Sequence, residues 1–209
     1  KERIDVALNI VLHKNQRIIH SNPARFKYIK TGKRFGKTYW AIFELLQKAF
    51  EVPGVYWYTA PYRNQAKTIA WNIILWMLPD KLIRRKLENE LFIELINSSK
   101  IYLIGEDHEE SLRGPALHGV IRDECALNPK GDYTWSAIIR GQLASTKGWA
   151  YHISSPNPKG RNWYSGACEE AERRMKTDKD YAYFHYTIWD NPTLDPVEVE
   201  AAKNGMPDY

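Results

Sequence analysis

Apolar and polar residues alternate in short blocks along the chain, and the first clear block is followed by a change of spacing. The segment RFKYIKT, residues 25–31, is rich in strand-forming residues and ends directly before Gly32. From residue 36 to residue 50 the apolar positions recur every three to four residues, for example at Ala41 and Leu45. The pattern therefore predicts a strand, a glycine-containing turn and a helix in succession.

The same two kinds of spacing continue through the rest of the chain. In chain order we expect a strand at 53–60, a helix at 64–78, a β-hairpin at 90–105, strands at 118–125 and 148–158, and a helix from Asn162. Strands that alternate with helices favour an α/β domain, with a mostly parallel sheet flanked by helices.

Length and composition limit the classes of protein to consider. A chain of 209 residues can form one well-cored domain with a small appendage. No run approaches about 18 consecutive apolar residues, the length that a membrane span needs. No signal peptide opens the sequence, so we expect a soluble, cytosolic protein without a membrane partner. The formal net charge of +5 permits an anionic partner without identifying one.

The turn at residues 31–38 resembles a phosphate-binding loop with an irregular start. The general pattern, G-x-x-x-x-G-K-[ST], places glycine where this chain has Thr31, and Gly32 comes one residue later. In such a loop backbone N–H groups hold the phosphates, Lys37 reaches the β- and γ-phosphate oxygens, and the Thr38 hydroxyl holds Mg²⁺. A lysine-rich surface turn is the alternative interpretation.

Two adjacent acids follow the apolar run at 118–122. Asp123 at the end of a strand can hold the same Mg²⁺ as Thr38. Glu124 would project toward the γ-phosphate and orient or deprotonate the attacking water. Alone, such a pair is more often a solvated turn, but its position one strand–helix unit after the loop favours an ATPase site.

The loop GKRFGKT, residues 32–38, matches the form [GS]-[KR]-[QR]-x-G-K-[ST] at every position. This irregular form is typical of the ATPase domain of large terminase subunits, the DNA-packaging motors of tailed bacteriophage, and the chain resembles that family over nearly its whole length. The resemblance implies a P-loop NTPase of the additional-strand, catalytic-glutamate type, similar to RecA and helicases. The nucleotide contacts that it implies come from Gly32, Lys33, Arg34, Phe35, Gly36, Lys37 and Thr38.

Shorter motifs resemble other parts of the same family. NQRIIHSNPARFKYI resembles the segment before the loop, which implies that Gln16 contacts adenine and that Arg25 belongs to the nucleotide site. ISSPNP resembles the coupling motif, which implies that Ser154, Ser155 and Asn157 sense the γ-phosphate. An ordinary surface glutamine and an ordinary loop are the alternatives.

The stretch SLRGPALHGVIRDE resembles the arginine–glycine segment of the family before its acidic strand end. Arg113 lies where the family places an arginine finger, which implies that it acts on the ATP of a neighbouring subunit. A structural salt bridge near Asp107 or Glu109 is the alternative for this side chain.

The resemblance also implies a division of the chain. We expect an ATPase core at 1–160 and a lid subdomain at 161–209, which contains TIWDNPTL and a helix at 196–205. Large terminases continue into a nuclease domain that this sequence lacks, so no nuclease activity is expected from it.

Together these motifs predict an Mg²⁺-dependent ATPase that uses ATP, works as a homo-oligomeric ring and couples hydrolysis to movement of double-stranded DNA into a procapsid. The resemblance implies three partners, which are double-stranded DNA, the portal of the procapsid and a small terminase subunit, in the cytoplasm of the infected bacterial host. Two alternatives stay open, a helicase-like DNA-dependent ATPase and a nucleotide-switched DNA-binding or assembly module.

A basic run, DKLIRRKLENE, lies beside the predicted hairpin. Four cations in six residues could follow a DNA backbone, and the candidate contacts are Lys81, Arg84, Arg85 and Lys86. A solvated helix face is nearly as good an interpretation of this run.

Overall fold

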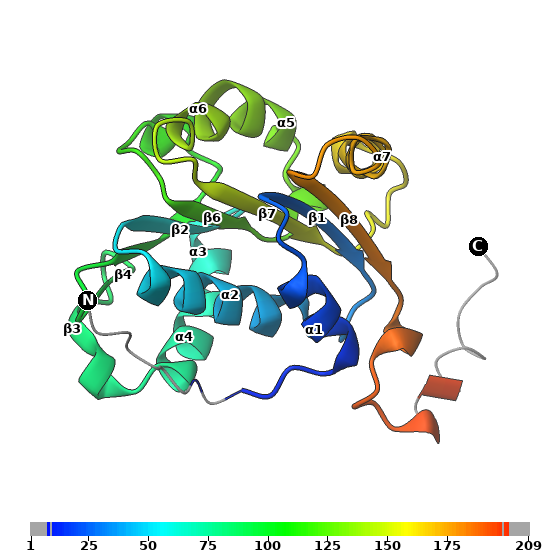
Figure 1. Ribbon diagram of the computed structural model, residues 1–209, viewed down its shortest axis with the longest axis horizontal. Coiled ribbons are helices and arrows are strands. Elements are labelled where there is room, and N and C mark those ends of the chain that lie inside the picture. Colours follow the sequence, from blue (N-terminus) through cyan, green and yellow to red (C-terminus); the bar gives the residue numbers. More distant parts are fainter. Residues whose placement is uncertain (1–7, 9, 198, 201–209) are drawn as a thin grey trace.

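One mixed sheet of eight strands organises the part of the chain that the structure describes, residues 8, 10–197 and 199–200 (Figure 1). The structure is a computed structural model. Across the sheet the strands follow the order β3-β4-β5-β2-β6-β7-β1-β8. Their bounds are β1 (Phe26–Thr31), β2 (Val55–Ala60), β3 (Ile83–Leu87), β4 (Phe92–Leu95), β5 (Lys100–Gly105), β6 (Gly119–Arg122), β7 (Trp149–Ser154) and β8 (Tyr181–Tyr186).

Most strand pairs are parallel. From β5 through β2, β6, β7 and β1 to β8 every neighbouring pair is parallel, whereas β3 with β4 and β4 with β5 are antiparallel. The prediction of an α/β fold with a mostly parallel sheet is confirmed. Parallel pairing brings the carboxyl ends of β1, β2, β6 and β7 to one edge, where the segments that follow them meet.

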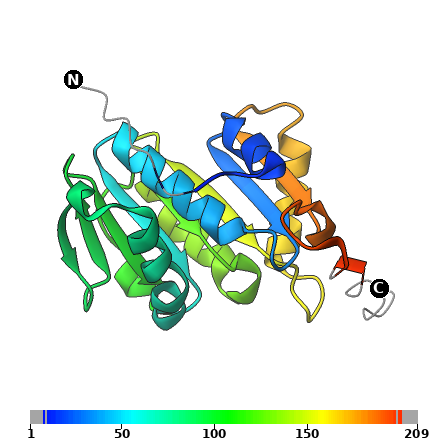
Figure 2. The same cartoon turned by 90° about the horizontal axis from the view of Figure 1, so that it is seen from below.

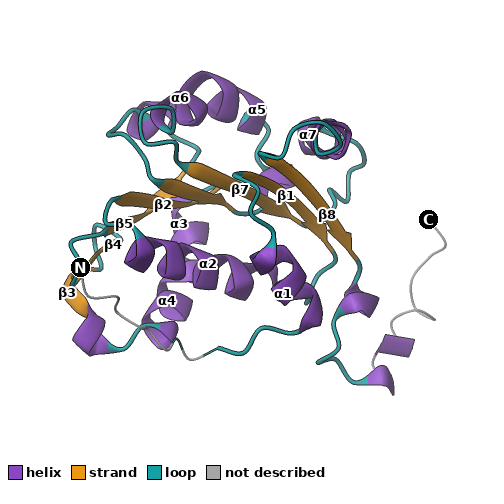
Figure 3. Ribbon diagram, viewed as in Figure 1, coloured by secondary structure: helices purple, strands orange, loops and turns teal. Residues whose placement is uncertain are grey.

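Helices cover both faces of the sheet (Figures 1 and 3). One face carries α1 (Lys14–Ser21), α2 (Lys37–Glu51), α3 (Arg63–Ala66) and α4 (Asn72–Met77), and the other carries α5 (Gly131–Tyr133), α6 (Arg140–Gln142) and α7 (Trp163–Arg174). The π-helical segments Lys67–Trp71 and Thr134–Ile139 connect α3 to α4 and α5 to α6, and single 3₁₀ turns occur at Asp80–Leu82, Glu109–Leu112, Cys125–Leu127 and Ile188–Asp190. Each face has its own hydrophobic core.

Helix α2 crosses the sheet between the edge formed by β3, β4 and β5 and the edge formed by β8 (Figure 2). Its buried residues include Trp40, Ala41, Leu45 and Ala49, so the predicted apolar spacing is the face that packs on the sheet. The 15-residue helix begins directly after the loop and is anchored along its length, which fixes the position of the loop.

The basic run after α4 forms an edge strand, not the solvated helix face given as the alternative. Residues 83–87 are β3, which pairs only with β4 among the described strands and has three exposed cations in its middle. Charged side chains on an edge strand oppose pairing with another sheet. The apolar ends, Ile83 and Leu87, are partly buried and hold the strand to the sheet.

The expected boundary at residue 160 does not coincide with an edge of the core. Both α7 and β8 lie within 161–209, yet β8 pairs in parallel with β1 and α7 packs on the second core. Strand β8 extends the sheet beyond β1, and the buried face of α7 covers one side of it, so both elements belong to the same core as the residues before 160. Of the helix expected at 196–205, residues 198 and 201–205 lie outside the described residues.

Among the described residues, no helix has the length and apolar character that a membrane crossing requires.

Candidate functional site

The loop between β1 and α2 presents unpaired backbone donors at the carboxyl edge of the sheet. Arg34 has a φ of 62° and Gly36 a φ of 87°, both in the left-handed region. Left-handed residues in a turn form concavities of N–H groups that bind anions. Within the described part of the chain, no backbone oxygen accepts a hydrogen bond from the N–H groups of residues 33–38. The loop therefore offers an anion site at the N-terminus of α2.

The left-handed φ of 87° favours glycine at position 36, and the Gln16 side chain packs against it. A Cβ atom there would lie 2.8 Å from Nε2 of Gln16, which donates a 3.0 Å hydrogen bond to the Gly36 carbonyl. Gln16 also accepts a hydrogen bond from the His13 backbone at 3.1 Å, so α1 is tied to the loop. The structure thus places Gln16 beside the loop, where its family role as an adenine contact stays a prediction.

The side chains of the loop point in different directions. The Phe35 ring is 1% exposed and stacks on Tyr186 at a centroid distance of 5.0 Å, so only its backbone can face a ligand. Lys33 and Arg34 are exposed. The Arg34 carbonyl accepts a 2.6 Å hydrogen bond from Asn191, which holds the loop from its other side.

Lys37 joins three strand ends. Its Nζ lies 3.0 Å from Oε1 of Glu124, after β6, and donates a 3.0 Å hydrogen bond to the hydroxyl of Ser155, after β7. The Lys37 and Glu124 side chains are 11% and 21% exposed, so the ion pair is sheltered but reachable. Lys37 and Glu124 are 87 residues apart in the sequence but are direct neighbours in space.

Asp123 is held in place by three donors. Its Oδ2 accepts hydrogen bonds from the hydroxyl groups of Tyr58 at 2.5 Å and Thr38 at 3.0 Å, and its Oδ1 accepts one from the Glu124 backbone at 2.8 Å. Burial raises the pKa of Asp123, the Glu124 charge adds to this effect, and Lys37 opposes it. Carboxylate and hydroxyl oxygens are the protein ligands that Mg²⁺ accepts beside phosphate oxygens and water, so Thr38 and Asp123 fit this ion.

Glu124 occupies a strained turn. Its φ of 51° and ψ of 40° lie in the left-handed region, which costs about 1–3 kcal/mol for such a residue. Ser154 donates a 3.3 Å hydrogen bond to Oε2 of Glu124 and accepts a 3.1 Å bond from the Ala126 backbone, so it holds both the side chain and the turn after it. The arrangement turns the carboxylate toward Lys37 and away from the sheet core.

A buried polar network supports this turn, and sequence reasoning missed it. Arg122 binds Glu106 in a bidentate pair, at 2.7 Å from Nε to Oε1 and 2.6 Å from an Nη to Oε2, and both side chains are at most 4% exposed. Burial alone would raise the pKa of Glu106, but the charge and hydrogen bonds of Arg122 outweigh burial and lower it. Further donors to the Glu106 carboxylate are Thr59, Asn128 and Thr134.

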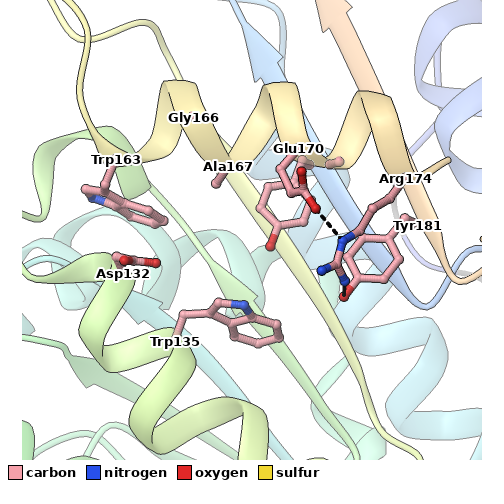
Figure 4. A pocket seen from close by; sticks show the side chains of 10 residues that line it. Asp132, Trp135, Trp163, Gly166, Ala167, Glu170, Arg174 and Tyr181 are labelled. Carbon is pink, nitrogen blue, oxygen red and sulfur yellow. Dashed lines mark hydrogen bonds and ion pairs between the residues drawn. The ribbon is translucent and has the colours of Figure 1, made fainter.

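Helix α7 is bonded to the same turn. Asn162, the N-cap of α7, donates a 2.6 Å hydrogen bond to the Ala126 carbonyl, and the indole N–H of Trp163 donates a 2.6 Å bond to the Asn128 carbonyl. Trp163 also lines an open cavity of about 390 Å³ between α5 and α7, with Trp135 and Asp132 on its opposite wall (Figure 4). None of the predicted site residues lines that cavity.

Arg25 lies at the end of β1 that is opposite to the loop. Arg25 precedes β1 and the loop follows β1, so the six-residue strand separates Arg25 from the loop by about 20 Å. The Arg25 guanidinium donates hydrogen bonds to the carbonyls of Gly148 at 2.6 Å and Leu143 at 3.1 Å. These bonds join the amino end of β1 to the segment that leads into β7.

Asn157 follows β7 and Arg113 precedes β6. The Asn157 carboxamide accepts a hydrogen bond from the Lys159 backbone at 3.0 Å and lines a surface cavity beside α7, and its role with Ser154 and Ser155 stays a prediction. Arg113 is exposed in the connection from the 3₁₀ turn Glu109–Leu112 to β6.

The four basic candidates on and before β3 differ in their contacts. Arg84 donates hydrogen bonds to a carboxylate and a hydroxyl of the hairpin at 3.3 and 2.8 Å, and Lys86 lies 3.4 Å from Asp80. Lys81 and Arg85 are exposed and make no ion pair with any residue that the structure describes. Arg85 and Lys81 are therefore the candidates with unengaged charge.

Comparisons with known sequences identify relatives. The profile of the family described as "Terminase large subunit, T4likevirus-type, N-terminal" matches residues 28–209. The terminase large subunit of Thermus phage G20c is 28% identical over 209 aligned positions, which cover 85% of this chain and 42% of that protein. The chain therefore spans less than half the length of this relative.

Solved structures share the fold. The Thermus phage P74-26 large terminase ATPase domain superposes with a TM-score of 0.77 at 24% identity, covering 96% of this chain and 91% of that one. The large terminase of another thermophilic bacteriophage, in complex with ATP-γ-S, gives a TM-score of 0.71 at 17% identity, covering 93% of this chain and 49% of that one. The resemblance first seen in GKRFGKT is confirmed by the profile match. The chain belongs to the terminase large subunit family and corresponds to its N-terminal region.

Proposed function

We propose that this chain is the ATP-hydrolysing motor domain of a viral DNA-packaging terminase, which uses ATP and Mg²⁺ and couples hydrolysis to translocation of double-stranded DNA into a procapsid. One observation carries the proposal. A loop lysine lies 3.0 Å from a carboxylate that is held at a second oxygen by Ser154. The neighbouring Asp123 and Thr38 supply oxygen ligands for Mg²⁺ beside that pair.

The order of the central strands supports assignment to the additional-strand, catalytic-glutamate type of P-loop NTPase. Strand β7 lies between β1, which leads to the loop, and β6, which leads to Asp123 and Glu124. The extra strand therefore separates the loop from the acids within the sheet. The large terminase of the thermophilic bacteriophage, which shares this fold, has been solved with ADP and with ATP-γ-S, and this supports a nucleotide site here.

The residues divide the reaction between them. The loop N–H groups and Lys37 bind and orient the phosphates, and Thr38 and Asp123 would hold Mg²⁺, which would offset charge on the phosphate oxygens. Phosphate oxygens compete with Glu124 for Lys37, so ATP binding releases the Glu124 carboxylate from its ion pair. The freed carboxylate then orients a water molecule and accepts its proton, a role that typically contributes 10²- to 10⁴-fold in rate.

Ser155 gives the site a way to sense its ligand. Its hydroxyl accepts a hydrogen bond from Lys37, while the preceding Ser154 bonds Glu124. A γ-phosphate that draws Lys37 away changes both contacts at the end of β7. Ser154 and Ser155 are therefore proposed to couple hydrolysis to movement of the segment that leads to α7.

Membership of the family supports a larger assembly. We propose a homo-oligomeric ring on the portal of a procapsid, in the cytoplasm of the infected bacterial host, with a small terminase subunit as a further partner. In that ring Arg113, which is exposed before β6, acts as an arginine finger on the ATP of the next subunit. Residues 161–209 include the segment proposed as the lid, and Gln16 is proposed to contact adenine.

Phosphate release from the purified chain separates this proposal from its alternatives. We expect Mg²⁺-dependent release that is lost in Lys37→Ala and kept in Lys48→Ala, a matched change at the other end of α2. A nucleotide-switched assembly module would bind ATP without releasing phosphate, even with DNA present. A helicase-like ATPase would be stimulated by single-stranded DNA more than by duplex DNA.

A further inference from the structure

We infer that Tyr58 is a positioning residue for Mg²⁺, because it sets the orientation of the Asp123 carboxylate from the neighbouring strand; this inference rests on the proposed function. Tyr58 is fully buried on β2, and its hydroxyl lies 2.5 Å from Oδ2 of Asp123. The strands β2 and β6 are paired with Tyr58 opposite Ile121, two residues before the acid. The contact is therefore fixed by the sheet and not by a mobile loop.

Tyr58 shares its acceptor oxygen with Thr38, whose hydroxyl lies 3.0 Å from the same Oδ2. A threonine at this position of the loop is expected to turn its oxygen toward Mg²⁺. Once Thr38 ligates the ion, Tyr58 remains as the side chain that fixes Oδ2, while the Glu124 backbone fixes Oδ1 at 2.8 Å. Tyr58 thus keeps one carboxylate orientation both with and without the ion.

A tyrosine hydroxyl donates its proton to a carboxylate oxygen, so this contact fixes the direction in which Oδ2 of Asp123 points. Partners that orient a metal-binding carboxylate typically account for 10- to 100-fold in metal affinity. Removing the Tyr58 hydroxyl leaves the phosphate-binding loop and Lys37 untouched. The loss should therefore appear in binding of the ion and not in binding of the nucleotide alone.

The same strand offers a matched control. Tyr56 lies two residues earlier and is 1% exposed, and its hydroxyl donates to backbone carbonyls, those of Lys48 and Val52 at 3.1 and 2.6 Å. These acceptors lie at the end of α2, away from the loop. Tyr56→Phe therefore removes a comparable tyrosine hydroxyl that makes no contact with Asp123.

The test measures Mn²⁺ binding by electron paramagnetic resonance, and Mg²⁺-dependent binding of a fluorescent ATP analogue, in the wild type, Tyr58→Phe and Tyr56→Phe. We expect Tyr58→Phe to need 10- to 100-fold more metal, to bind the analogue in EDTA as the wild type does, and to add no further loss to Asp123→Asn. Tyr56→Phe should keep the wild-type metal affinity and change only thermal stability.

Three results would overturn the inference. They are wild-type metal affinity in Tyr58→Phe, an equal loss in Tyr56→Phe, or loss of metal-free analogue binding in Tyr58→Phe, which would indicate a general structural role. A wild-type chain without metal-dependent nucleotide binding would instead contradict the proposed function, so the two failures are distinguishable.

Discussion

Replacing Arg122 by methionine should destabilise the protein more than most single substitutions, and more at neutral pH than in acid. The substitution leaves the Glu106 carboxylate 4% exposed and without its bidentate partner, although donors from Thr59, Asn128 and Thr134 remain. Removing one member of a buried ion pair typically costs about 3–5 kcal/mol, because the other charge stays uncompensated. We therefore expect a loss of about 3–5 kcal/mol in the free energy of unfolding at pH 7.5.

The pH dependence follows from the sign of the pKa shift. In the wild type Arg122 lowers the pKa of Glu106, so Glu106 contributes stability above its unfolded pKa and loses it as the pH falls through the folded pKa. In Arg122→Met the opposing charge is gone and only the neutral donors Thr59, Asn128 and Thr134 remain, so we expect burial to raise the folded pKa of Glu106. The loss in the free energy of unfolding is then fully present at neutral pH and becomes smaller as protons bind Glu106 in acid. The difference in stability between the wild type and Arg122→Met therefore narrows toward pH 5.

Urea denaturation followed by circular dichroism at pH 7.5 and pH 5 measures both effects. Arg122→Met/Glu106→Gln, which removes both charges, should recover part of the loss at pH 7.5 and show little pH dependence. A loss below about 1 kcal/mol, or a loss of equal size at both pH values, would refute the assignment of a paired buried charge under the Asp123–Glu124 turn.

Two further predictions concern the proposed assembly. Arg113→Ala and Glu124→Ala proteins should each be inactive, but a mixed ring should regain ATPase activity, because Glu124→Ala subunits supply the arginine finger and Arg113→Ala subunits supply the carboxylate. The finger is worth about 10³- to 10⁵-fold in rate. Mixtures that stay inactive while wild-type rings hydrolyse ATP would exclude action between subunits. Arg85→Ala should lower the slope of log affinity for duplex DNA against log salt concentration by about one, and Arg84→Ala should lower it by less, because the hairpin already binds the Arg84 guanidinium. Unchanged slopes would indicate that these cations only oppose pairing of the β3 edge with another sheet.

Local signals in the sequence were sufficient for the central part of the fold. The strand, loop and helix at 25–50 became β1 and α2, because apolar spacing and the glycines act over neighbouring residues. Strand β3 was missed because an edge strand keeps its polar residues on the outside and shows no apolar alternation. Strand β8 was missed as part of the core because its parallel pairing with β1 joins segments far apart in sequence.

The candidate site divides in the same way. Lys37, Thr38, Asp123 and Glu124 were predictable because each belongs to a short motif with a known chemical requirement. Their supports were not predictable, because the sheet order alone brings Tyr58 beside Asp123 and Glu106 beside Arg122. Arg25 was assigned to the nucleotide site from a family motif, whereas its guanidinium bonds the carbonyls of Gly148 and Leu143 at the other end of β1, a long-range contact that no local signal shows.

A single-turnover measurement with Glu124→Ala tests the central claim most directly. The protein is held in excess over radiolabelled ATP and Mg²⁺, and bound ATP and ADP are separated after quenching, so a slow isolated domain still gives a clear result. The account predicts that Glu124→Ala binds ATP with an affinity near that of the wild type and keeps it intact, while the wild type converts it to ADP. Conversion by Glu124→Ala at the wild-type rate would contradict the assignment of this carboxylate as the group that activates water.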